Sequence, residues 1–127
     1  MRDQYGSLQV LPLGPDGAPA TPRMLTQVRA VNATAAGDTA VWTPAPGRRF
    51  VLLRVSMEAS NTANVFLKDG AAPLTPQVTM TNARGQVVYD FGPTGYRSAA
   101  PGNALAVNLG VAAASPGIAV LALGWEE

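Results

Sequence analysis

From residue 27 onward, apolar side chains alternate with polar ones or run in short blocks, and the blocks are bounded by Gly, Pro, Asn or Asp. This pattern constrains the fold more than any other feature, because a period of two residues is that of a β-strand, whose successive side chains lie on opposite faces of a sheet. The blocks recur at intervals of about ten residues, which is typical of all-β domains. The expected strands are 27–34, 39–43, 48–60, 64–68, 77–82, 86–91, 104–109 and 118–125.

Two of these strands show the alternation most clearly. In 48–60, one face is expected to carry apolar side chains, opposite a charged and polar face; the apolar set is Val51, Leu53, Val55 and Met57. In 104–109, the apolar face is expected to be Leu105, Val107 and Leu109. Such strands specify their pairing register, because a slip of one residue would move the buried set to the solvent face.

Turn signals separate the strands. The sequences Asn-Ala-Arg-Gly at 82–85 and Ser-Pro-Gly at 115–117 favour reversal of the chain. The apolar segment 104–125 is long enough to span a bilayer, but Asn108 and the central Ser-Pro-Gly interrupt it, so a β-hairpin is expected there instead. No segment beyond residue 47 shows a capped helical stripe. Eight short strands therefore predict an all-β fold, a jelly-roll-like β-sandwich.

The first 23 residues differ from the rest of the chain. Prolines at 12, 15, 19 and 22 and a Gly-Pro-Asp-Gly turn at 14–17 predict an extended Pro/Gly-rich arm or loose hairpin over 1–23. The segment also lacks the continuous apolar core of a secretion signal. Residues 24–127 are expected to form the β-sandwich, since 127 residues are the size of one domain.

Composition excludes several chemistries. The chain has no histidine and no cysteine, which rules out Ser-His-Asp and Cys-His catalysis, disulfides and zinc sites built from these ligands. It has no Gly-rich phosphate-binding motif. The sequence therefore predicts no catalytic residue, no metal site and no cofactor.

The remaining polar candidates favour structural roles. Asp38, Glu58, Asp69 and Asp90 are far apart in sequence, and two of them would form a glycosidase-like acid and base only if the fold brought them together. The aspartates are expected in turns, bonded to their own backbone. Lys68, the one lysine of the chain, could activate a serine nucleophile, but a solvated charge at a turn is expected.

Charge and aromatic content argue against two classes of ligand. Nine Lys and Arg against eight Asp and Glu give a net charge of +1, and the charges are scattered, so nucleic acid is not an expected partner. Aromatic residues are 6% of the chain. Trp42 and Trp125 each end an apolar strand, where packing in the core or at its rim is expected rather than a sugar-binding platform.

Four short segments resemble small virion proteins of tailed bacteriophages. The segments are VWTPAPGRRFVLLRV from residue 41, NVFLKDG from 64, GYRSAAPGNALAVNL from 95 and the terminal GWEE. This group has a W-T-P-x-x-G-[KR]-x-[FY] opening strand, a [KR]-D-G turn, a G-Y-x-S…N-x-L segment and an acidic end. The matching residues are Trp42, Thr43, Pro44, Gly47, Arg48, Phe50, Lys68, Asp69, Gly70, Gly95, Tyr96, Ser98, Asn103, Leu105, Glu126 and Glu127. The chain departs from the pattern in its N-terminal extension and in the proline-rich segment 71–76.

The resemblance implies a non-enzymatic virion protein of β-sandwich fold. Capsid decoration (cement) proteins of this kind bind the outer capsid surface as homotrimers, with the major capsid protein and neighbouring copies as partners, after synthesis in the host cytoplasm. The alternative is a tail- or fibre-associated sandwich that contacts host-surface carbohydrate through exposed aromatics such as Tyr96 and Trp125. A carboxylate-based glycosidase is a third reading. Neither nucleic acid nor a membrane is expected as a partner.

A Pro-rich arm ahead of a sandwich has one clear physical use. Such an arm can order on a neighbour by adding a strand to an open sheet edge, with alternate side chains in pockets. Partner contacts are therefore expected from the apolar and aromatic side chains of the arm, which are Tyr5, Leu8, Val10, Leu11 and Leu13.

Overall fold

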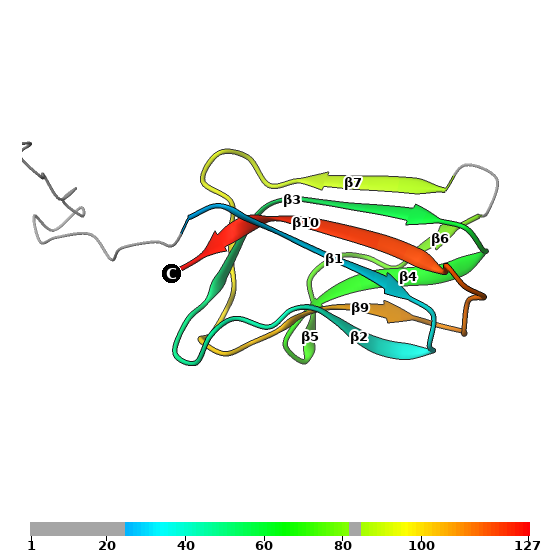
Figure 1. Ribbon diagram of the computed structural model, residues 1–127, viewed down its shortest axis with the longest axis horizontal. Helices are drawn as coiled ribbons and strands as arrows, with labels where there is room; N and C mark the ends of the chain where they lie inside the picture. Colours follow the sequence, from blue (N-terminus) through cyan, green and yellow to red (C-terminus); the bar gives the residue numbers. More distant parts are fainter. Residues whose placement is uncertain (1–24, 82–84) are drawn as a thin grey trace, which may run out of the picture.

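The computed structural model describes residues 25–81 and 85–127, and Figure 1 shows them as two facing layers of antiparallel strands. The strands, in chain order, are β1 (Gln27–Ala33), β2 (Gly37–Trp42), β3 (Phe50–Ala59), β4 (Ala63–Asp69), β5 (Ala72–Pro73), β6 (Val78–Met80), β7 (Gln86–Asp90), β8 (Tyr96–Arg97), β9 (Leu105–Leu109) and β10 (Ile118–Glu126). One sheet has the order β1-β10-β3-β7, with β8 also on β3; the other has the order β2-β9-β4-β5, with β6 also on β4. The predicted all-β sandwich is confirmed.

The strand pairing identifies the topology. β7 and β8 pair with successive parts of one edge of β3, and β5 and β6 do the same along β4, so each pair is one interrupted strand. Eight strand paths remain, and they are nested: β1 pairs with β10, β2 with β9, β3 with β7 and β8, and β4 with β5 and β6. This nesting across two sheets is that of a jelly roll.

One expectation about local structure was wrong, and two short strands were not foreseen. Residues 104–125 do not form a hairpin, because β9 and β10 belong to different sheets and the 110–117 connection crosses from one sheet to the other. The proline-rich segment 71–76 is partly strand: β5 lies in it, and Thr75 accepts a hydrogen bond on Oγ1 from the Leu67 amide at 3.0 Å. The short strand β8 was also not foreseen, since two residues are too few to show a period.

A β-bulge changes the facing of β3. The register with β10 shifts between Leu123 and Gly124, opposite Leu53, so that Leu52 is fully buried while Leu53 is partly exposed. The expected alternation therefore holds at Val55 and beyond. On the N-terminal side of the bulge Val51 is buried as expected, but Leu52 is buried as well and Leu53 is not, because the extra residue reverses the facing of the strand. In β9 the predicted apolar face is buried as expected.

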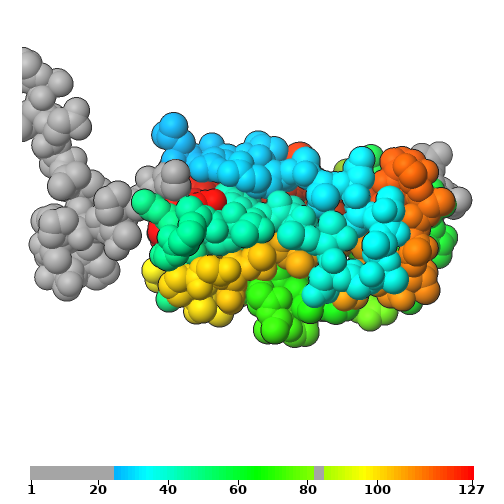
Figure 2. Space-filling model, turned by 60° about the horizontal axis from the view of Figure 1, so that its bottom comes forward, coloured from blue at the N-terminus to red at the C-terminus, as the bar shows by residue number. Residues whose placement is uncertain are grey.

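The core lies between the two sheets. Its largest fully buried side chains come from both layers and include Trp42, Phe50, Leu52, Met57, Leu67, Met80, Leu105, Leu109 and Ile118. The two ends of the sandwich are closed by connections, with residues 93–103 at one end and 110–117 at the other, as Figure 2 shows in yellow and orange. Figure 1 places the C-terminus at the same end as 93–103.

Candidate functional site

The carboxylates of the described residues are dispersed. Asp38 lies on the outer face of the β2-β9-β4 sheet, Glu58 on the outer face of the other sheet, and Asp69 is buried at the end of β4. Asp90 accepts a hydrogen bond from the Gly92 amide at 2.9 Å, as expected for a turn aspartate. The fold therefore brings no pair of these side chains to one groove in the geometry of a glycosidase.

Asp69 is a buried carboxylate that holds three segments together. Its Oδ2 accepts hydrogen bonds from the Tyr96 hydroxyl at 2.6 Å and the Ala99 amide at 2.8 Å. Its Oδ1 accepts from the Ser98 hydroxyl at 2.9 Å and the Asn103 amide at 3.1 Å. The side chain does not bond its own turn, so the expectation for this aspartate was wrong. Four donors satisfy a charge that burial would otherwise penalise.

The same contacts set the ionisation of the cluster. Burial alone would raise the pKa of Asp69, but the hydrogen bonds from Tyr96, Ala99, Ser98 and Asn103 outweigh burial and hold that pKa below its ordinary value. Burial and the adjacent Asp69 carboxylate raise the pKa of Tyr96 to about 12. The ionised carboxylate and the neutral phenol are therefore the stable pair over the neutral pH range.

Two glycines, Gly70 and Gly95, let the backbone pass close to other atoms of this cluster. Gly70 follows Asp69 with a φ of 62°, and a Cβ there would lie 2.8 Å from Cγ of Asn103. Gly95 precedes Tyr96 with a φ of 76°, and a Cβ there would lie 2.8 Å from the Leu52 carbonyl oxygen. A side chain at either position would displace the loop that carries the donors.

Glu126 is a second buried carboxylate at the same end of the sandwich. Its Oε2 accepts a hydrogen bond from Nε1 of Trp42 at 2.8 Å, and its Oε1 accepts from the Ala45 amide at 3.1 Å. The backbone of Glu127 exchanges hydrogen bonds with Arg49 at 2.8 and 2.9 Å. Leu105 of β9 pairs with both Trp42 and Asp69, which places the two carboxylate clusters close together across the sheet.

The residues of the phage resemblance converge on these two clusters. Asp69 of the K-D-G segment binds the G-Y-x-S segment and the following Asn, whereas the Trp of the opening strand and the acidic end meet at Glu126. Lys68 of the same segment pairs with Asp38 instead. These motifs were missed as a site because their members lie far apart in the sequence. A carboxylate at the end of an apolar strand, as at Asp69 and Glu126, could have indicated these clusters, because a buried polar group must have hydrogen-bond partners.

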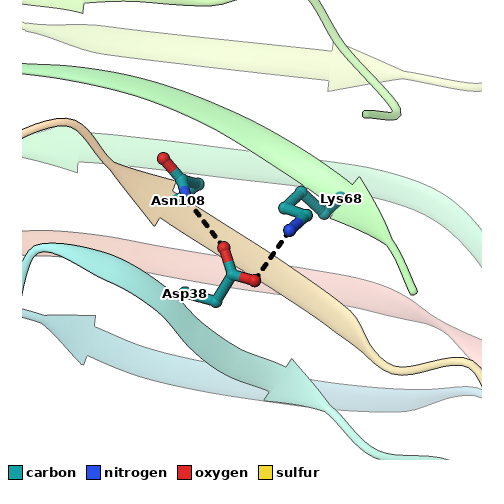
Figure 3. Close-up of polar contacts among 3 residues, drawn as sticks. All are labelled: Asp38, Lys68 and Asn108. Atoms are coloured by element: carbon teal, nitrogen blue, oxygen red, sulfur yellow. Dashed lines mark hydrogen bonds and ion pairs between the residues drawn. The ribbon is translucent and has the colours of Figure 1, made fainter. Parts of the chain in front are cut away.

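The outer face of the β2-β9-β4 sheet carries a group of bonded polar side chains beside Phe66, and Figure 3 shows the central contacts. We call it the polar face. Asp38 accepts a hydrogen bond from Nζ of Lys68 at 2.8 Å and another from Nδ2 of Asn108 at 2.7 Å. Lys68 lies within β4 and is ion-paired, so the expectation of a solvated turn charge was wrong, as was the turn position of Asp38. The contacts from Lys68 and Asn108 hold the pKa of Asp38 below its ordinary value. The polar groups of this face satisfy one another.

The outer face of the other sheet differs, and three rows of side chains cross it from β1 to β7. The first row is Asn32, Ala119, Glu58 and Gln86; the middle row is Ala30, Leu121, Ser56 and Val88; the last row is Val28, Leu123, Arg54 and Asp90. Six of these twelve residues are polar or charged. We nevertheless call the twelve together the apolar face, after Val28, Val88 and Leu121, which are 55%, 50% and 48% exposed. A shallow hollow lies over the first two rows, where the side chains of Ala30 and Ala119 are shorter than those around them.

Neither of the aromatics proposed for carbohydrate binding is a free platform. Trp125 is buried, with 7% of its surface exposed, which confirms the expected packing at the core and contradicts the exposure that the carbohydrate-binding alternative requires. Tyr96 is partly buried, packs at 5.9 Å from the ring of Phe91 and donates its hydroxyl proton to Asp69. The expected arm contacts, Tyr5, Leu8, Val10, Leu11 and Leu13, lie outside the described residues.

Two further kinds of site are absent from the described part of the chain. Residues 25–81 and 85–127 contain no group of three or more acidic side chains that could hold a metal ion. The same residues contain no helix that is long and apolar enough to cross a bilayer.

Comparison with known proteins gives a structural likeness to a viral particle protein. No family model and no curated protein matches this chain. A chain in the cryo-EM structure of a virus-like particle of extra small virus from the giant freshwater prawn Macrobrachium rosenbergii is similar, with a TM-score of 0.49, 18% sequence identity and coverage of 99% of this chain and 94% of that chain. The jelly-roll topology is defined by the strand pairing described above.

Proposed function

We propose that this protein is a non-enzymatic structural component of a tailed-phage particle, and specifically a capsid decoration protein bound to the outer capsid surface. The observation that carries this proposal is that the residues shared with phage virion proteins form buried hydrogen bonds within the fold. The segments that resemble phage virion proteins supply Asp69, Glu126 and their donors, all of which tie connections to the sandwich. Polar residues used in this way build a rigid framework rather than a reaction site.

The partners that fit this role are the major capsid protein and neighbouring copies of the same chain, assembled as a homotrimer on the particle after synthesis in the host cytoplasm. The arm, residues 1–23, would supply the capsid contact through Tyr5, Leu8, Val10, Leu11 and Leu13. An arm of this kind gains strength from repetition, because many weak contacts act together on a lattice.

Immunogold electron microscopy of particles from the source tests the location. An antibody raised against residues 25–127 is expected to label heads evenly, and the same antibody preabsorbed with the purified protein serves as the control. Labelling confined to tails or fibres would support the alternative, a sandwich that contacts host-surface carbohydrate, and a glycan array would then test that role. Particles without label would contradict both roles.

Deletion of residues 1–23 tests the arm separately. The truncated chain is expected to lose binding to undecorated capsids in a sedimentation assay while its circular dichroism spectrum stays that of the full chain. Combined Leu8→Ser and Leu11→Ser substitutions should weaken binding in the same direction. Unchanged capsid binding by the truncated chain would refute the role of the arm.

A further inference from the structure

The apolar face is the surface of the described chain that most lacks a partner. Five large hydrophobic side chains are exposed among the described residues: Leu25, Val28, Val88, Val111 and Leu121. Three of them lie on this one sheet face, although they come from β1, β7 and β10. Contiguous exposed apolar surface of this kind marks interaction sites, whereas scattered single residues do not.

The strand register puts these side chains in reach of one another. Leu121 pairs with Ala30 on one side and with Ser56 on the other, and Ser56 pairs with Val88. The middle row thus crosses all four strands with three apolar side chains, Ala30, Leu121 and Val88, and one small polar side chain, Ser56. Outward side chains of adjacent strands are close neighbours, so the row forms one continuous strip.

Charged residues lie on either side of this strip, with the acidic Glu58 in the first row and the Arg54–Asp90 pair in the last. The first row carries Glu58 next to Gln86, and Glu58 forms no ion pair with any residue of 25–81 or 85–127. The last row carries Arg54, whose Nη2 lies 3.7 Å from Oδ2 of Asp90, with the two side chains 60% and 64% exposed. A pair so exposed contributes little, so Arg54 is free to meet another carboxylate.

We propose that the apolar face binds the same face of a second copy of this chain, about a two-fold axis that lies in the interface, crosses the strands and passes along the middle row. This operation places the first row of one copy on the last row of the other. Glu58 then faces Arg54 of the second copy, and Gln86 faces its Asp90. Leu121 and Val88 pack against their own symmetry mates at the centre.

The geometry of sheet packing permits this contact. Two sheets that pack face to face lie about 10 Å apart, and the long side chains of Glu58 and Arg54 can meet across that distance. Each charge pair occurs twice, because a two-fold contact uses the same patch on both copies. The polar face offers no such match, since its Asp38 is already bonded to Lys68 and Asn108.

This two-fold contact goes beyond the proposed function, because it is separate both from the homotrimer proposed on the particle and from the arm. Sedimentation equilibrium of the purified full chain tests it without any capsid, so its failure leaves the location test unaffected. The wild-type chain is expected to show a monomer–dimer equilibrium. Glu58→Arg and Arg54→Glu are each expected to weaken the dimer by at least about a hundredfold, because each places two repulsive pairs in the interface.

The decisive part of the experiment is to combine the two charge changes, either by mixing the two variant chains or by placing both substitutions in one chain. An equimolar mixture of the Glu58→Arg and Arg54→Glu chains should form a heterodimer with affinity within about tenfold of the wild type, since opposite charges face each other at both positions. The double variant Glu58→Arg/Arg54→Glu should dimerise with itself for the same reason. Asp38→Arg, a matched charge change on the polar face, should leave the dimer unchanged.

Apolar substitutions check the centre of the contact. Leu121→Asp should abolish the dimer, whereas Val111→Asp, at an exposed valine of the 110–117 connection, should not. Circular dichroism shows whether each variant is folded. A wild-type chain that stays monomeric at about 1 mM, where a weak contact would be half formed, overturns the proposal. So does a mixture that stays monomeric although both charge variants are folded.

Discussion

Asp69 concentrates much of the polar stabilisation of this fold in a single side chain. Its two oxygens accept four hydrogen bonds from Tyr96, Ser98, Ala99 and Asn103. Asp69→Asn would place an amide group opposite two of these donors and remove the charge that strengthens all four. We expect a loss of about 2–4 kcal/mol in the free energy of unfolding, because buried donors are left without acceptors.

Urea denaturation followed by fluorescence measures this loss as a lower midpoint at unchanged slope. Asp38→Asn is the matched control, since Asp38 also accepts two side-chain hydrogen bonds but lies on the exposed polar face. Its effect should stay within about 1 kcal/mol. Equal losses for the two variants would contradict the role assigned to the Asp69 cluster.

The raised pKa of Tyr96 predicts that the folded chain loses stability at high pH. Its pKa is raised from 10.0 to about 12 in the folded chain. A raised pKa means that the folded state holds the proton more tightly, so the contribution is fully present below pH 10 and is lost as pH rises from 10 to 12. The lowered pKa of Asp69 acts at the other end of the scale, where stability is lost as pH falls below about 4.

The absorbance of phenolate measures the ionisation of Tyr96 at high pH directly. The chain has three tyrosines, and one of them should ionise near pH 12, with that step absent from Tyr96→Phe. The same variant should remove most of the decline in urea midpoint between pH 10 and 12. Ionisation of all three tyrosines near pH 10 in the folded chain would contradict the prediction.

At the scale of elements, the pairing of β3 with β10 depends on one glycine at the bulge. Gly124 pairs with Leu52, and a Cβ there would lie 1.9 Å from the Val51 carbonyl oxygen. Gly124→Ala must therefore separate two central strands, and we expect a loss of about 2–4 kcal/mol.

Gly110→Ala is the matched control, because a Cβ at Gly110 would meet its nearest atom at an ordinary 3.5 Å. Its effect on the urea midpoint should be within about 1 kcal/mol. Comparable losses for the two alanines would show that the bulge does not need the close approach.

The elements also show which parts of the fold can be read from the sequence. The strongly alternating β9 and the apolar β10 were predicted within one residue of their ends, because a buried strand must repeat apolar side chains. The bulge at Leu53 and the short strands β5 and β8 were not predicted, because each is fixed by a pairing partner from another part of the chain.

At the scale of the whole molecule, the nested topology predicts slow folding. β1 pairs with β10, so the first described strand must find the last before that sheet is complete. Contacts between distant parts of a chain carry the largest loop-closure cost in the folding transition state. Refolding by stopped-flow dilution from urea is expected to take about milliseconds to seconds. A relaxation in microseconds would show that the transition state forms from local contacts alone.

What the sequence determined by itself was the class of the fold and the chemistry it excludes. Alternating apolar residues specify strands and their buried faces locally, and the absence of histidine and cysteine removes whole families of sites whatever the fold. Only the tertiary structure decided which strands pair, that β9 and β10 lie in different sheets, and that Asp69 and Glu126 are buried. It also decided that Val28, Leu121 and Val88 share one exposed face. Pairing between distant strands is a property of the whole chain, since each strand can satisfy its own pattern against many partners and only the closed core selects one.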